Sequence, residues 1–71
     1  MNNKNITVGD LMDITLKRSL VEIYDEERPE GEKEYTIHYH GSAEEVPEDL
    51  KSKLIKRVFT IDSFPGMYIS V

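Results

Sequence analysis

The sequence predicts one small α+β domain with the element order α-β-β-α-β-β. Apolar residues near the start recur at helical spacing, and later segments alternate apolar and polar residues as strands do. Segments that contain Pro and Gly separate these stretches. Two hairpins that each follow a helix favour a four-stranded, mostly antiparallel sheet with helical cover on one face, which leaves the other face open.

The length of the chain limits how much core it can form. Its 71 residues are near the lower limit for folding alone, and they contain no cysteine for a disulfide or a thiolate metal site. Stability must then come from a small core or from self-association. We expect a single domain over residues 1–71, in which residues 1–6 form a flexible N-terminus.

The first predicted helix covers residues 8–17. TVGD, residues 7–10, resembles a capping box, in which a Thr and an acid three residues later bond to each other's backbone N–H groups. The apolar residues of one helical face are Val8, Leu11 and Met12. The β-branched Ile14 and Thr15 weaken the last turn.

Residues 19–25 and 34–40 read as two strands joined by a charged loop that contains Pro29 and Gly31. Strand alternation puts Val21 and Ile23 on one face of the first strand and Leu20, Glu22 and Tyr24 on the other. The second strand divides in the same way into Tyr35, Ile37 and Tyr39 against Thr36, His38 and His40. The apolar set predicts the core face, with Ile37 as its surest member.

After Gly41, which we expect to end the second strand, Pro47 suits the first turn of a short helix that runs to about Leu54. Residues 55–62 and 67–71 then predict the third and fourth strands. Pro65 followed by Gly66 fits a type II turn between them, with Gly66 at positive φ.

The net charge of −5 at pH 7 disfavours direct binding to nucleic acid or to anionic membranes. The start of the chain lacks the apolar stretch of a signal peptide, and no run could span a membrane, so we expect a cytoplasmic protein. A basic run late in the chain follows an acidic cluster. The acidic cluster consists of Glu44, Glu45, Glu48 and Asp49. It is either a solvated surface or a negative patch that docks on a basic protein.

His38 and His40 could bind one metal from the same strand face, but a metal site needs a third or fourth ligand. We therefore expect neither a metal nor another cofactor. The polar face instead predicts a contact surface, since Tyr and His offer flat, amphipathic side chains. Its members are Tyr24, His38, His40 and Tyr68, with Phe59 or Leu20 beside them. The alternative is that these residues pack beneath a helix as a second core layer.

The sequence offers no cysteine nucleophile, Gly-rich phosphate loop or recognisable Ser-His-Asp arrangement, so we do not expect an enzyme. A protein-binding module is the first interpretation. A small-ligand or metal-binding protein, such as a sponge for a nucleotide signal, and a structural or assembly subunit are the alternatives. Edge strands and an open sheet face favour a homodimer over a monomer.

Three segments carry a resemblance: TVGDLMD at the start, VEIYDE in the first strand, and GSAEEVPEDL before a V-x-x-I strand. In these the chain resembles small accessory proteins of phages and mobile elements from low-GC Gram-positive bacteria. The resemblance implies a short, soluble, acidic inhibitor of a host protein, of the anti-CRISPR or other anti-defence type. The implied partner has a basic surface, as a nucleic-acid-binding enzyme such as a defence nuclease does. No functional residues carry over from this group.

Overall fold

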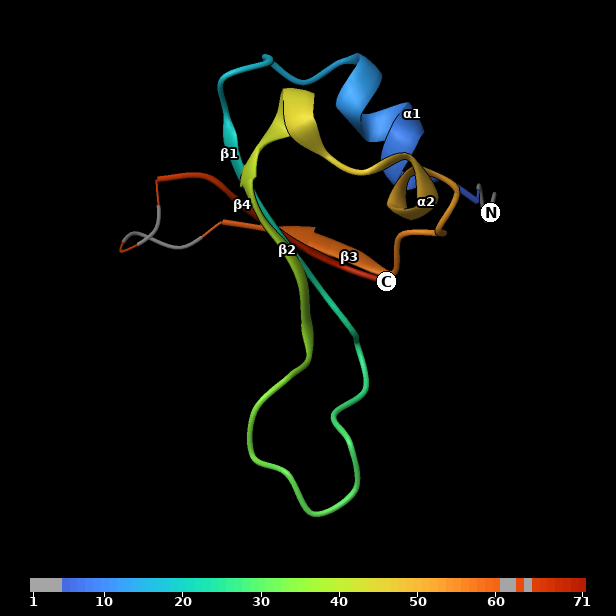
Figure 1. Ribbon diagram of the computed structural model, residues 1–71, viewed down its shortest axis with the longest axis vertical. Helices are drawn as coiled ribbons and strands as arrows, with labels where there is room; N and C mark the ends of the chain where they lie inside the picture. The colour runs from blue at the N-terminus through green and yellow to red at the C-terminus, as the bar shows by residue number, and fades with distance from the viewer. Residues whose placement is uncertain (1–4, 61–62, 64) are drawn as a thin grey trace.

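The computed structural model describes residues 5–60, 63 and 65–71, and it confirms the α+β class (Figure 1). Part of the expected flexible N-terminus, residues 1–4, and of the third predicted strand, residues 61–62, lies outside the described residues. The helical segments are α1 (Val8–Asp13), the 3₁₀ turn η1 (Ala43–Glu45) and α2 (Glu48–Lys51). The second helix was predicted to run to about Leu54 but ends at Lys51, because Leu54 instead forms an isolated β-bridge with Thr7. The strands are β1 (Leu20–Tyr24), β2 (Ile37–Ser42), β3 (Arg57–Phe59) and β4 (Met67–Ser70).

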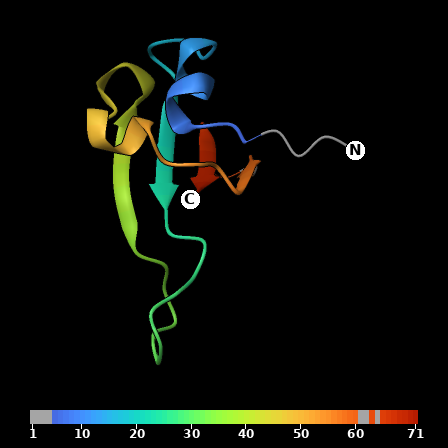
Figure 2. The same ribbon diagram turned by 90° about the vertical axis from the view of Figure 1, so that its right-hand side faces the viewer.

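The four strands form one sheet in the order β2-β1-β4-β3, which Figure 2 shows with the helices in front. Both hairpins are antiparallel, since β1 pairs with β2 and β3 pairs with β4. The two hairpins meet at the centre through a parallel pair, β1 with β4. The sheet is therefore mixed, and the predicted antiparallel pairing holds within each hairpin but not between them.

The core lies between one face of this sheet and the helical segments, as Figure 1 shows. Val21, Ile23 and Ile69 of the central strands are fully buried, as the alternation in β1 predicted for the first two. The helical side contributes Val8, Ala43, Val46 and Leu50. These apolar side chains form one contiguous cluster, so the covered face carries the hydrophobic stabilisation.

The capping box at α1 is confirmed. Thr7 Oγ1 accepts a hydrogen bond from the Asp10 N–H at 3.1 Å, and the Thr7 N–H donates to Asp10 Oδ2 at 3.2 Å. The helix ends at Asp13, four residues before the predicted end, because the β-branched Ile14 and Thr15 do not extend it. Before α1, Ile6 lies within the expected flexible segment, yet its carbonyl accepts a bond of 2.8 Å from the Ile55 N–H.

The strand β2 contains a bulge that overturns part of the predicted face assignment. Tyr39 pairs with Ile23, but Tyr24 pairs with Ile37, so His38 is an extra residue between the two pairs. Tyr39 packs against the core as predicted. Ile37 lies instead on the open face beside Tyr24 and is 52% exposed, so its assignment to the core was wrong. The strand also continues through Gly41 to Ser42.

Gly66 does not have the positive φ that a type II turn requires; among the described residues, only Gly31 has one. Its need for glycine is steric, because a Cβ atom at this position would lie 2.0 Å from the Leu20 carbonyl oxygen. The close approach lies where β4 enters the sheet beside β1.

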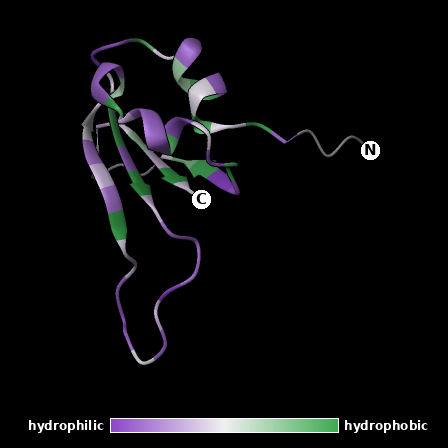
Figure 3. Ribbon diagram, turned by 45° about the vertical axis from the view of Figure 1, so that its right-hand side comes forward, coloured by the Kyte–Doolittle hydropathy of each residue, from purple (hydrophilic) through white to green (hydrophobic). Residues whose placement is uncertain are grey.

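Gly31 belongs to the β1–β2 loop, which projects from the body and is almost entirely hydrophilic (Figure 3).

Candidate functional site

The open face of the sheet carries four aromatic rings that contact one another in a row, which we call the aromatic row: Tyr35, Tyr24, Tyr68 and Phe59. Tyr24 meets Tyr35 edge-on with ring centroids 5.0 Å apart and meets Tyr68 at 6.5 Å. Tyr68 stacks on Phe59 at 5.3 Å with an interplanar angle of 27°. Strand pairing puts Tyr24, Tyr68 and Phe59 on the face opposite the core, since Tyr68 pairs with Glu22 and with Phe59. Tyr35 precedes β2 and joins the row through its contact with Tyr24.

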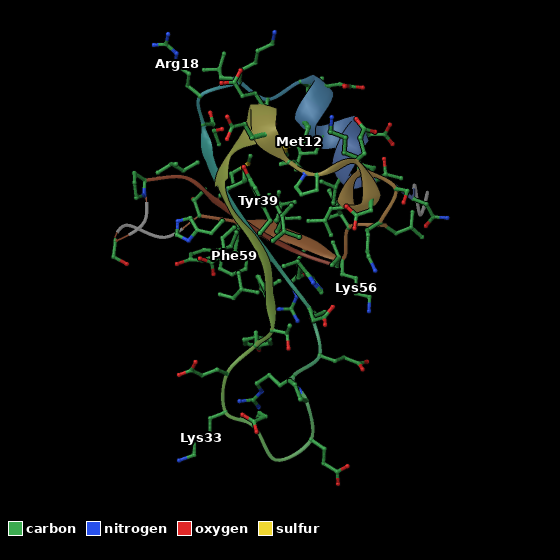
Figure 4. All side chains as sticks on the ribbon, in the orientation of Figure 1. Met12, Arg18, Lys33, Tyr39, Lys56 and Phe59 are labelled. Atoms are coloured by element: carbon green, nitrogen blue, oxygen red, sulfur yellow. The ribbon has the colours of Figure 1, made fainter. Side chains whose placement is uncertain are left out.

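A groove of about 410 Å³ runs along the aromatic row where the β1–β2 loop meets the sheet. Besides the four rings, its walls are formed by Glu22, Lys33, Glu34 and Ile37. Figure 4 shows Lys33 on the projecting loop with its side chain extending outward, and Phe59 beside the sheet away from α1. The groove therefore combines ring faces with two carboxylates.

The two histidines do not form one site, because the bulge separates them. His40 pairs with Glu22 on the open face, and its Nδ1 lies 3.2 Å from Glu22 Oε1. His38 lies at the bulge, and its Nε2 lies 2.8 Å from Asp25 Oδ1. The alternation that placed both histidines opposite Ile37 was wrong for His40, which lies on the same face as Ile37.

A polar cluster of Glu26, Arg57 and Ser70, which we call the clasp, holds the start of the β1–β2 loop against β3 and β4. Arg57 donates a hydrogen bond to the Glu26 carboxylate, and the Glu26 N–H donates to the Val71 carbonyl at 2.9 Å. The Ser70 hydroxyl, and after it the Arg57 guanidinium, hold the pKa of Glu26 below its usual range. Ser70 Oγ is buried and makes no hydrogen bond of normal geometry to the described residues.

Tyr24 is the member of the aromatic row that lies next to the clasp. Burial raises the pKa of its hydroxyl, and the negative charge of Glu26 raises it further. The ring is 9% exposed, so it forms the floor of the groove more than its surface. Tyr24 therefore connects the loop anchor to the exposed rings.

The predicted acidic cluster lies on the helical side of the molecule. Glu44 and Glu45 belong to η1, and Glu48 and Asp49 belong to α2. The ammonium of Lys51 is 3.2 Å from the Glu48 carboxylate. Because η1 and α2 cover the core face, this cluster and the aromatic row are two separate surfaces.

The sequence-based prediction left five groove residues out of the contact surface: Glu22, Lys33, Glu34, Tyr35 and Ile37. Tyr35 and Ile37 were placed in the core by strict alternation, and the bulge at His38 invalidates that count. Glu22 was placed on the correct face. Two signals in the sequence were available: Glu22 lies two residues before Tyr24 and so on the same strand face, and it lies shortly before a charged loop.

Among the described residues, no three His, Asp or Glu side chains are grouped so that they could hold a metal ion. In the same part of the chain, no helix has the length and apolar character needed to cross a membrane. The sequence matches no family model, and comparisons with curated proteins and with solved structures find no significant similarity.

Proposed function

We propose that this chain is a non-enzymatic protein-binding module and that the open sheet face with its aromatic row is the binding surface. The observation that carries the proposal is exposure: Tyr35 is 48% exposed, Ile37 52% and Phe59 40%, all around one groove. Aromatic residues that gather on an exposed face are typical of protein interfaces, because they provide large contact area with few rotatable bonds. An apolar patch of this kind marks a contact site more often than a solvated surface.

The specific form of the proposal is an inhibitor of a host protein, made by a phage or mobile element. It rests on the resemblance carried by TVGDLMD, VEIYDE and GSAEEVPEDL, and on the net charge of −5. An acidic protein is attracted to a basic partner surface, and opposite charges speed association. A nucleic-acid-binding enzyme of a defence system offers such a surface. The acidic cluster on η1 and α2 would then steer the approach, while the aromatic row makes the contact.

The experiment is a capture from host lysate with paired variants of the immobilised protein. The test variant is Tyr35→Ala with Phe59→Ala, which removes two exposed rings. The matched control is Ile14→Ala with Leu16→Ala, which removes two exposed apolar side chains, 83% and 81% accessible, from the connection after α1. A partner that is lost with the test variant and retained with the control supports the proposal. A partner retained equally by both variants contradicts it.

A small-ligand function is the second candidate, because a groove of about 410 Å³ suits a small molecule. A ligand that binds the folded state should raise the melting temperature of the isolated protein. A panel of nucleotides and divalent metals measures this directly. A shift that disappears in the Tyr35→Ala, Phe59→Ala variant would favour this candidate over protein binding.

Self-association is the third arrangement to be tested, because both outer strands, β2 and β3, have an edge that no described strand covers. A homodimer would double the chain mass of 8.2 kDa in light scattering. If the dimer breaks in the Tyr35→Ala, Phe59→Ala variant, the aromatic row is a self-association surface. The module would then act in assembly and not as an inhibitor.

A further inference from the structure

The groove beside the aromatic row carries more information than an apolar patch, because two carboxylates line it together with the rings. We infer that this groove receives an arginine side chain of the partner protein. The inference rests on the proposed protein-binding function and specifies the chemistry of the partner's anchor residue. Three features carry it: the state of Glu22, the geometry of the rings, and the balance of charge around the groove.

Glu22 is a largely covered carboxylate whose ion-pair partner is an imidazole. Its side chain is 16% exposed, and its only ion-pair partner in the described part of the chain is His40 at 3.2 Å. An imidazole carries a positive charge only when protonated, so it does not supply a permanent countercharge. Covering a carboxylate is costly unless a cation or hydrogen-bond donors compensate it. A guanidinium that enters the groove would provide both.

The rings favour a planar cation over a compact one. A guanidinium is flat, stacks on aromatic faces and bonds a carboxylate through two parallel N–H groups, whereas an ammonium is a strongly hydrated point charge. The chain already contains one such contact, since the guanidinium of Arg28 lies 5.6 Å from the centre of the Tyr35 ring. Arg28 is not among the residues that line the groove, so Tyr24 and the stacked pair of Tyr68 and Phe59 remain as further walls.

The charge balance selects a cationic occupant. Glu22, Glu34 and Lys33 are the charged residues of the groove walls, which leaves one net negative charge, and the whole chain carries −5. Lys33 extends outward from the loop (Figure 4). An acidic or neutral anchor would leave Glu22 without its countercharge. An arginine on a basic partner surface satisfies the carboxylate and fills the apolar groove with its methylene chain.

The test uses short capped peptides and NMR spectra of the full-length protein. The probe is acetyl-Gly-Gly-Arg-Gly-Gly-amide, and the comparison peptides replace Arg with citrulline, which is neutral and of the same shape, or with Lys. We expect the Arg peptide to shift the ring resonances of the groove with weak affinity, because one side chain buries little surface. The citrulline and Lys peptides should bind at least about tenfold more weakly, since charge and planarity are both required. Equal binding of citrulline or Lys overturns the inference.

Two variants keep the test decisive. Glu22→Gln preserves shape and should weaken the Arg peptide about tenfold, whereas Glu30→Gln makes the same charge change in the exposed part of the loop and should leave it unchanged. Tyr35→Ala removes a ring that is outside the core, so it should weaken binding without unfolding the protein. Equal affinity in Glu22→Gln and Glu30→Gln overturns the inference.

The outcome is separable from that of the proposed function. If the lysate partner depends on Tyr35 and Phe59 but binds Glu22→Gln as well as wild type, the protein-binding function stands and the arginine anchor is wrong. If the Arg peptide binds in the groove with the expected selectivity but no partner depends on the rings, the groove chemistry stands and the proposed function is wrong.

Discussion

The two faces of the sheet are built from the same strands, yet they differ in chemistry. On the covered face, Val21, Ile23 and Ile69 are aliphatic and fully buried beneath the helices. On the open face, the aromatic row is partly exposed and lies beside two carboxylates. The difference suggests that one side of each strand stabilises the fold while the other is available for contact. Substitutions on the two sides should therefore have separable effects.

The largest expected effect is on stability, from Ile69→Ala. Removing this fully buried side chain should lower the free energy of unfolding by about 2 to 5 kcal/mol, which is much of what a domain of this size has. Phe59→Ala on the open face should cost about 1 kcal/mol or less, because the ring is partly exposed and its main loss is the stacking on Tyr68. Urea denaturation followed by circular dichroism compares the two. Equal losses would mean that the open face is a second core.

The next effect concerns the junction that both faces share. Gly66→Ala places a Cβ atom against the Leu20 carbonyl at the point where β4 meets β1, and should cost about 1 to 3 kcal/mol as the backbone shifts. Gly31→Ala is the comparison: its φ of +84° is strained for alanine, but no atom lies within 4 Å of the new Cβ. We expect a loss of about 1 kcal/mol there. The same denaturation curves measure both variants, and a larger loss at Gly31 would contradict the steric account of Gly66.

Local signals in the sequence predicted the covered face well. The capping box at Thr7, the alternation of Val21 and Ile23, and the Pro47 start of α2 all involve residues close in sequence, and each is found in the structure. The apolar stripe at four-residue spacing, Val46, Leu50 and Leu54, is only partly confirmed: Val46 and Leu50 belong to the core, whereas Leu54 is 51% exposed.

The open face was predicted less well because it depends on pairing between distant segments. A single extra residue at His38 puts Ile37 on the face opposite to the one that strict alternation predicts, and no local pattern signals a bulge. The parallel pairing of β1 with β4 likewise joins segments more than forty residues apart. The sequence therefore indicated Tyr24, Tyr68 and Phe59 as neighbours but not the groove that Tyr35 and Ile37 complete.

A smaller effect is expected from the clasp, through pH. The pKa of Glu26 is lowered in the folded protein by Ser70 and Arg57. The ionised carboxylate therefore stabilises the fold at pH values above 4.5, the ordinary pKa of a glutamate. This contribution is lost as the pH falls below 4.5 and through the lowered pKa of the folded state. Glu26→Gln should therefore show a shallower fall of melting temperature on acidification. Thermal denaturation between about pH 3 and 7 measures this. Glu30→Gln is the control and should keep the wild-type slope; a wild-type slope in Glu26→Gln would contradict the role of the clasp.

The smallest stability effect is expected at the histidines. These two residues compare a side chain that contacts the groove wall with one that does not. Neither ring belongs to the core cluster, so His38→Ala and His40→Ala should each change the free energy of unfolding by no more than about 0.5 kcal/mol. Their effects on partner binding should differ. His40 contacts Glu22 on the groove wall, whereas His38 contacts Asp25, which is not part of the groove. His40→Ala should therefore weaken capture of the partner, because Glu22 loses the group that positions it, while His38→Ala should not. Capture assays on the two single variants, with denaturation as the check of folding, decide the matter. If both variants weaken capture equally, the two histidines contact the partner together, and the contact surface extends around the edge of β2 beyond the groove.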